Sequence, residues 1–260
     1  MPGGALLHAA ALGLGANVAL GLIAWAASIP ARDVSIVDAA WGLLVVAPAI
    51  VVAAVIPEPG PRALLTLLLS GAWALRLAVH IAWRHRGQPE DRRYQAIRRR
   101  NEPNFAVKSV YLVFGLQALL AWVVSMPLVA AVASAEPWGT LDLAGFALLS
   151  FGLVFETVAD AQLTRFRSEP RTKGTVMDRG LWRYSRHPNY FGECCIWWGA
   201  WLVAAAGGMA WTIPSPLLMT VLLLKVSGVT LLESDIRERR PGYADYVRRT
   251  PAFFPWRPSR

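Results

Sequence analysis

The sequence GLWRYSRHPNYFGE, residues 180–193, is polar, yet it leads directly into an apolar segment that begins at Cys194. A chain shows this kind of boundary where it enters a membrane. The polar stretch 180–193 carries guanidinium, imidazole, amide, carboxylate and phenol groups, on Arg183, Tyr184, Arg186, His187, Asn189, Tyr190 and Glu193. This set suits a phosphorylated, aromatic cofactor better than a metal ion, because the cysteine and carboxylate spacing of a metal site is missing. The alternative is an ordinary loop beside the membrane whose cations face lipid headgroups.

The composition indicates a membrane protein. The chain has 260 residues, 55% of them hydrophobic, with a mean hydropathy of +0.39. Several apolar runs reach about 20 residues, the length that spans a bilayer. We therefore predict an all-α, polytopic bundle of seven transmembrane helices, at 5–29, 36–56, 62–84, 107–134, 141–163, 193–207 and 215–234. It should form one membrane domain, 1–260, with a substrate half, 1–134, and a cofactor half, 135–260.

The distribution of charge argues against a nucleic-acid partner despite the net charge of +9. Of the 26 Lys and Arg residues, 8 fall in 84–108, 7 in 165–188 and 7 in 235–260. Clustering of this kind follows from the positive-inside rule, so these three segments should be cytoplasmic. With seven spans, the C-terminus is then inside and the N-terminus outside. The two cysteines are adjacent, which makes a disulfide framework improbable.

Charged side chains within the predicted spans cost a few kcal/mol each unless they are paired or hydrated. They include Asp38, Arg76, His80, Glu156, Asp160, Lys225 and Glu233, with Arg167 on the extension of the fifth span. They could simply pair to hold the bundle together. As a group they concentrate toward the predicted cytoplasmic end, which favours a polar cavity open to the cytosol.

The segment from Glu233 to Pro255 interleaves arginine and tyrosine, including Arg237, Tyr243 and Tyr246. Side chains of these two types can bind phosphates and stack on rings. The alternative is a basic helix lying on an anionic leaflet.

The polar stretch 180–193 resembles the signature of the steroid 5-alpha-reductase family, including its bacterial members. A shorter version, Arg-His-Pro-x-Tyr with a following Gly, also occurs in the isoprenylcysteine carboxyl methyltransferases. The resemblance is strongest over 156–255 and implies a seven-helix bundle, in a bacterial inner membrane, that binds NADPH in its cytoplasmic half. The residues that it implies for NADPH are Asp160, Arg167, Arg179, Tyr184, Arg186, His187, Asn189, Tyr190, Glu193, Arg237, Tyr243 and Tyr246.

The sequence also departs from that family. Glu156 stands where the family has an asparagine, and the family's substrate-binding Glu of the second helix and Tyr of the third do not carry over cleanly. Asp38 is the only carboxylate of the second predicted helix, and Tyr94 is the nearest tyrosine. We take Asp38 and Tyr94 as the candidate catalytic residues.

The leading hypothesis is an NADPH-dependent reductase of a lipid-soluble enone, such as a 3-oxo-4-ene steroid, that acts as a monomer and receives its substrate from membrane lipid. Asp38 could supply the acid if desolvation kept it protonated, and Tyr94 could donate a hydrogen bond to the carbonyl. The alternative is an S-adenosylmethionine-dependent membrane methyltransferase of the isoprenylcysteine or phospholipid type, with Glu233 as its late glutamate. No metal site is expected. A transporter would spread charges along a pathway, whereas here they cluster at one end.

Overall fold

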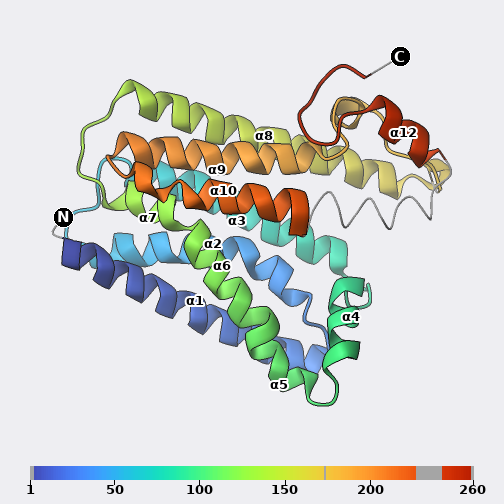
Figure 1. The fold of residues 1–260 in the computed structure, drawn as a ribbon, viewed down its shortest axis with the longest axis horizontal. Coiled ribbons are helices and arrows are strands. Elements are labelled where there is room, and N and C mark those ends of the chain that lie inside the picture. The colour runs from blue at the N-terminus through green and yellow to red at the C-terminus, as the bar shows by residue number, and fades with distance from the viewer. Residues whose placement is uncertain (1–2, 173, 227–241, 259–260) are drawn as a thin grey trace. The chain divides into compact units, whose positions relative to one another are not determined.

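The computed structural model describes residues 3–172, 174–226 and 242–258, and every regular element among them is a helix (Figure 1). The chain separates into two compact units. Unit 1 comprises Met1–Gly139 with Val203–Thr212, and unit 2 comprises Thr140–Leu202 with Ile213–Arg260. The assignment of the substrate to residues 1–134 and of the cofactor to residues 135–260 stays a prediction.

Three long helices form most of unit 1: α1 (Gly3–Ala31), α2 (Ile36–Val55) and α3 (Ala63–His85). They agree closely with the first three predicted spans. The backbones of α2 and α3 approach each other closely at Gly42, where a Cβ atom would lie 2.9 Å from the Cα atom of Ala74. A residue without a side chain is needed at this contact.

The basic segment 84–108 contains a short helix that we did not predict, α4 (Arg92–Asn101). The carboxylate of Asp91 accepts a hydrogen bond from the N–H of Arg93 and so caps the helix N-terminus. The helix ends before Glu102, whose helical conformation is disfavoured by the following Pro103.

The prediction of a single helix over 107–134 was also wrong. This part of the chain forms α5 (Phe105–Ser109), a π-helical segment (Val110–Gly115), α6 (Leu116–Val124) and α7 (Met126–Ala133). The helix breaks at Ser125, because Pro127 has no N–H with which to continue the hydrogen-bond ladder of α6. That missing donor costs little in the first turn of a new helix.

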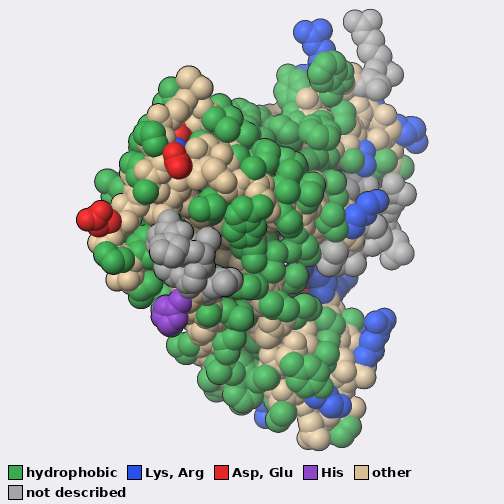
Figure 2. All heavy atoms as spheres, turned by 60° about the vertical axis from the view of Figure 1, so that its left-hand side comes forward, with side chains coloured by type: hydrophobic (Ala, Val, Ile, Leu, Met, Phe, Trp, Pro, Cys, Tyr) green, Lys and Arg blue, Asp and Glu red, His purple; other side chains and the backbone are tan. Residues whose placement is uncertain are grey.

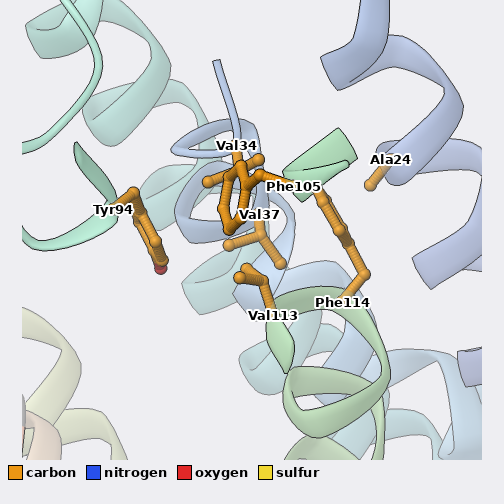
Figure 3. Packing of buried hydrophobic residues seen from close by; sticks show 7 residues of the cluster. All are labelled: Ala24, Val34, Val37, Tyr94, Phe105, Val113 and Phe114. Carbon is orange, nitrogen blue, oxygen red and sulfur yellow. The ribbon is translucent and has the colours of Figure 1, made fainter. Parts of the chain in front are cut away.

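One hydrophobic cluster ties the end of α1 to α4. Figure 3 shows its seven buried residues, Ala24, Val34, Val37, Tyr94, Phe105, Val113 and Phe114. They come from α1, the turn before α2, α2 itself, α4, α5 and the π-helical segment. The ring of Tyr94 forms one side of this cluster, so apolar packing fixes the direction of its hydroxyl group.

Unit 2 is built on two antiparallel helices, α8 (Thr140–Ser168) and α9 (Pro188–Ala206) (Figure 1). Their backbones nearly touch: a Cβ atom at Gly152 would lie 2.5 Å from the carbonyl oxygen of Gly192. A Cβ atom at Gly199 would lie 2.5 Å from the backbone nitrogen of Leu149. Small residues at helix contacts permit this approach in membrane proteins.

The remaining elements of unit 2 are α10 (Pro214–Val221), a π-helical segment (Leu222–Val226) and α12 (Tyr243–Arg249). The sixth predicted helix, 193–207, begins earlier than expected, at Pro188, since proline suits the first position of a helix. The polar stretch 180–193 therefore enters α9 with its last six residues.

Five described helices are long and apolar enough to cross a membrane: His8–Ala31, Ile36–Val55, Ala63–His85, Phe105–Val124 and Thr140–Ser168. A shorter apolar helical stretch follows at Ala210–Lys225. Figure 2 shows hydrophobic side chains over most of the visible face, as expected for a surface that meets lipid. The chain is thus an all-α membrane protein. The count of seven spans stays a prediction, because α9 is not among the five and the predicted span 215–234 lies partly outside the described residues.

Candidate functional site

A pair of polar residues, the buried Asp160 and the half-buried Asn189, lies where α8 and α9 face each other. The Asn189 side chain donates a hydrogen bond from Nδ2 to Oδ1 of Asp160 over 3.2 Å. Within the described residues, the Oδ1 atom of Asn189 is buried and has no hydrogen-bond partner. Asp160 is itself buried. A buried acceptor without a donor is costly, so this position is suited to a ligand that brings an O–H or N–H group.

Two further carboxylates lie one helical turn away along each helix. Glu156 precedes Asp160 by four residues and Glu193 follows Asn189 by four, and both are buried. The two helices meet here through Gly192, where a Cβ atom would lie 2.7 Å from the backbone nitrogen of Glu156. The absence of a side chain at residue 192 thus brings this end of α9 against the carboxylate-bearing face of α8.

The start of the polar stretch 180–193 packs on the end of α8. A short 3-10 turn, Gly180–Arg183, is held there by two hydrogen bonds. The Leu181 N–H donates to Oε1 of Gln162 over 2.9 Å, and the Trp182 indole donates to the Ala159 carbonyl over 3.0 Å. Gly180 has a positive φ of 58°, a conformation that favours glycine.

The rings of His187 and Tyr190 are parallel, with centroids 5.6 Å apart and an interplanar angle of 2°. His187 is buried, and its backbone N–H donates to the Ser185 hydroxyl over 3.1 Å. Stacking fixes both rings beside the first turn of α9, next to Asn189.

Arg186 and Tyr246 join the polar stretch 180–193 to the segment after residue 242. The Arg186 guanidinium donates to the carbonyls of Val247 (3.2 Å) and Thr250 (2.6 Å), which α12 leaves without helical partners. The Tyr246 hydroxyl donates to the Trp182 carbonyl. Tyr243 is buried against Tyr246, with ring centroids 5.8 Å apart. The side chains of Arg186, Tyr243 and Tyr246 thus contact other parts of the protein. Their contact with a cofactor stays a prediction.

The cations expected to meet phosphate lie at the surface of unit 2. Arg167, Arg179 and Arg183 are exposed, and the Arg179 guanidinium lies 6.0 Å from the centroid of the Phe166 ring. Tyr184 is also exposed. Arg237 and Glu233 lie outside the described residues.

A second cluster, in unit 1, brings the two candidate catalytic residues together. The Tyr94 hydroxyl donates to Oδ1 of Asp38 over 2.6 Å, and Nη2 of Arg93 donates to Oδ2 of the same carboxylate over 2.7 Å. Both Asp38 oxygens therefore accept hydrogen bonds, which leaves Tyr94 as the residue that holds a transferable proton.

Tyr94 is protected from ionisation. Burial raises the pKa of its phenol, and the charge and hydrogen bond of Asp38 raise that pKa further. Arg93 and a hydrogen bond from Gln117 act in the opposite direction, but the net direction is upward. The phenol consequently remains an O–H donor at any physiological pH.

A polar network at the ends of α1, α2 and α3 positions this cluster. Nε of Arg93 donates to Oδ1 of Asp91 over 2.9 Å, and the Asp91 N–H donates to the Ser35 hydroxyl over 2.8 Å. Nearby, Nε2 of His85 lies 2.6 Å from Oδ2 of Asp33. Burial alone would raise the pKa of Asp33, but hydrogen bonds from His85 and Ser35 outweigh it and lower that pKa.

Sequence reasoning missed Arg93 and Gln117. Tyr94 was chosen from the sequence as the nearest tyrosine, and the run Arg92-Arg93 beside it did not show which arginine would reach Asp38. Gln117 stands alone in an apolar run and gave no signal. Arg76 and His80, two of the charged residues of the predicted spans, both line an open hollow of about 480 Å³ on α3.

Comparison with known proteins gives one match. A family model described as a protein of unknown function, DUF1295, matches residues 24–250. No curated protein and no solved structure matches the chain.

Proposed function

Because the chain belongs to the DUF1295 family, which lies in the steroid 5-alpha-reductase-like group, we propose that it is a membrane-embedded, NADPH-dependent reductase. Its substrate would be a lipid-soluble enone, such as a 3-oxo-4-ene steroid, and the carbon–carbon double bond would be reduced. The proposal adds to the family assignment a cofactor, a reaction and a substrate class.

The observation that carries the proposal is the buried acceptor on Asn189. Its Oδ1 atom has no hydrogen-bond partner among the described residues, and the neighbouring Asp160 carboxylate supplies further acceptor capacity. Ribose hydroxyls and the carboxamide N–H₂ of a nicotinamide are donors of the kind that this pair would satisfy.

The residues around this pair fit the other parts of NADPH. Arg167, Arg179 and Arg183 are exposed cations of unit 2 and would bind the diphosphate and the 2′-phosphate. The parallel rings of His187 and Tyr190 offer an aromatic surface beside the pair. When bound, NADPH would supply the hydride that adds to the β-carbon of the enone.

Tyr94 is the residue we assign to the substrate carbonyl. Its phenol holds a proton that the Asp38 carboxylate now accepts as a hydrogen bond over 2.6 Å. An enone carbonyl that took the place of Asp38 as acceptor would receive this hydrogen bond, which would stabilise the negative charge that develops on the oxygen as the enolate forms. Asp38 would keep its hydrogen bond from Arg93 and would not act as the acid.

We further propose seven spans, with α9 and the segment from α10 onward as the sixth and seventh. The three basic clusters of the sequence support a C-terminus in the cytoplasm and an N-terminus outside. The membrane would be a bacterial inner membrane. The protein would act as a monomer.

The test is cofactor binding to detergent-purified protein, measured by calorimetry with NADPH, NADH and S-adenosylmethionine. We expect NADPH to bind most tightly. Asn189→Ala should weaken that binding about fivefold to tenfold, as the loss of one hydrogen bond predicts. Asn101→Ala is the control, because among the residues that the structure describes the Asn101 side chain donates to its own helix alone, at the Ile97 carbonyl. Binding of S-adenosylmethionine in place of NADPH would instead favour the methyltransferase. Equal NADPH affinity of wild type and both variants would remove the Asp160–Asn189 pair from the cofactor site.

A further inference from the structure

A row of aromatic rings runs along one side of unit 2, from α8 through α9 to the chain after α12. Phe151 and Phe155 have ring centroids 5.3 Å apart, Phe155 and Phe191 5.5 Å, and Phe191 and Phe254 6.0 Å. The two ends of this aromatic row are well exposed, Phe151 at 48% and Phe254 at 72%. An exposed row of this kind needs an apolar environment.

The position of the aromatic row along α8 relates it to the depth of a bilayer. The 29 residues of α8 extend about 44 Å, whereas the hydrocarbon core is about 30 Å thick. The end that carries Arg165 and Arg167 must therefore project beyond the hydrocarbon. Phe151, Val154 and Val158 form an exposed apolar stripe on the other part of the helix. The aromatic row thus leads from the middle of the α8 span toward the membrane surface.

An open hollow lies where the aromatic row ends. It has a volume of about 430 Å³ and is lined by Tyr184, Pro255, Trp256 and Arg257. Backbone bonds fix its two sides to each other, because the Trp256 N–H donates to the Tyr184 carbonyl over 2.9 Å. The Ser185 hydroxyl also donates to the Phe253 carbonyl over 2.8 Å. The hollow is therefore a preformed feature and not a gap between loose loops.

The chemistry of the hollow is that of a lipid headgroup site. Tryptophan and tyrosine favour the interfacial layer of a membrane, where a ring lies beside acyl chains and its polar atom meets water. Trp256 is 75% exposed. Arg257 is exposed too, and within the described part of the chain no acidic side chain pairs with it. A guanidinium at this level is suited to bind a phosphate in bidentate fashion.

We propose that unit 2 binds one anionic phospholipid. An acyl chain lies along the aromatic row Phe151, Phe155, Phe191 and Phe254, and the phosphate headgroup occupies the hollow beside Arg257. The positive charge of Arg257 favours an anionic headgroup over a zwitterionic one. This lipid site is separate from the Asp160–Asn189 pair and does not depend on the proposed reductase activity.

The experiment is native mass spectrometry of the protein released from nanodiscs that contain phosphatidylcholine and phosphatidylglycerol in equal amounts. We expect wild type to retain one phosphatidylglycerol preferentially. Arg257→Gln should reduce the retained fraction about tenfold, the effect of losing one charge-assisted hydrogen bond, and Trp256→Ala about fivefold, the effect of losing one ring face against the lipid. Both residues are exposed, so each variant should fold, and size-exclusion chromatography checks this.

Two matched controls replace residues of the same type elsewhere. Trp211→Ala removes an indole that is 56% exposed in unit 1, and Arg165→Gln removes an arginine whose side chain is 87% exposed on α8. Both should retain the lipid as wild type does. Equal retention in all five proteins would overturn the proposal. So would displacement of the lipid by millimolar inorganic phosphate, which would show a simple anion site, or by NADPH, which would assign the hollow to the nucleotide.

Discussion

A single methyl group at residue 199 should separate the two helices that carry the candidate cofactor site. A Cβ atom there would lie 2.5 Å from the backbone nitrogen of Leu149 and 2.7 Å from the carbonyl oxygen of Gly145, whereas ordinary contact begins at 3.4 Å. Both neighbours are backbone atoms, so no side chain can rotate away. The helices α8 and α9 must move apart by about 1 Å, and overpacking of this kind costs about 1–3 kcal/mol. At about 2–4 °C per kcal/mol, Gly199→Ala should lower the melting temperature by about 2–12 °C.

The assay is thermal unfolding in detergent, followed by tryptophan fluorescence, for which the chain has 12 Trp residues. Gly71→Ala on α3 is the control, because a Cβ atom at Gly71 meets nothing within 4 Å. Its melting temperature should be equal or higher, since alanine is more favourable than glycine in a helix by about 1 kcal/mol. If Gly199→Ala melted together with wild type while Gly71→Ala behaved as expected, the close packing of α8 on α9 would be refuted.

Three further outcomes are expected. Tyr94→Phe should lower turnover of an enone substrate about 10²–10⁴-fold while NADPH affinity is kept, because it removes the proton donor alone, and the exposed Tyr111→Phe should leave turnover unchanged. Equal turnover of both variants would exclude Tyr94 as the donor. Because hydrogen bonds from His85 and Ser35 lower the pKa of Asp33 in the folded protein, Asp33 adds stability above its ordinary pKa of 3.8 that is lost as the pH falls through the folded value. The melting temperature of wild type should exceed that of Asp33→Asn at neutral pH, and the two melting temperatures should converge in acid. A difference that widened in acid would show that the Asp33 pKa is raised by folding and not lowered. Reporter fusions within 84–108 should report the cytoplasm, and an external signal would invert the proposed topology.

The long apolar helices could be predicted from the sequence because hydrophobic length alone determines them. The helix α4 could not, since its sequence has no apolar periodicity and its stability comes from the Asp91 cap and from burial of Tyr94 against other segments. The break at Ser125 was missed for a different reason. Pro30 and Pro48 both lie inside continuous helices, so a proline in an apolar run does not by itself predict an interruption at Pro127.

The sequence predicted which residues belong to the candidate site, but it did not predict the contacts that these residues make. Asp160 and Asn189 were singled out from the resemblance, but the close approach that unites them depends on Gly152 and Gly192, which carry no functional group. Arg186 illustrates the opposite error. Its charge suggested phosphate binding, whereas its guanidinium donates to two backbone carbonyls more than 60 residues later in the chain. Sequence patterns over short distances do not contain such long-range contacts.

Those contacts have a consequence for biogenesis. When residues 180–193 leave the ribosome, the carbonyls that will accept from Arg186 and the hydroxyl of Tyr246 that will bond to Trp182 have not yet been synthesised. The conformation of the polar stretch can therefore be completed only after the intervening chain has entered the membrane and residues 242–256 have returned to it. Contacts so distant in sequence form late, which leaves this region open to mispairing and to proteases for longer than the helices of unit 1. Substitutions near residue 250 should consequently reduce the yield of inserted protein as severely as substitutions in the polar stretch itself.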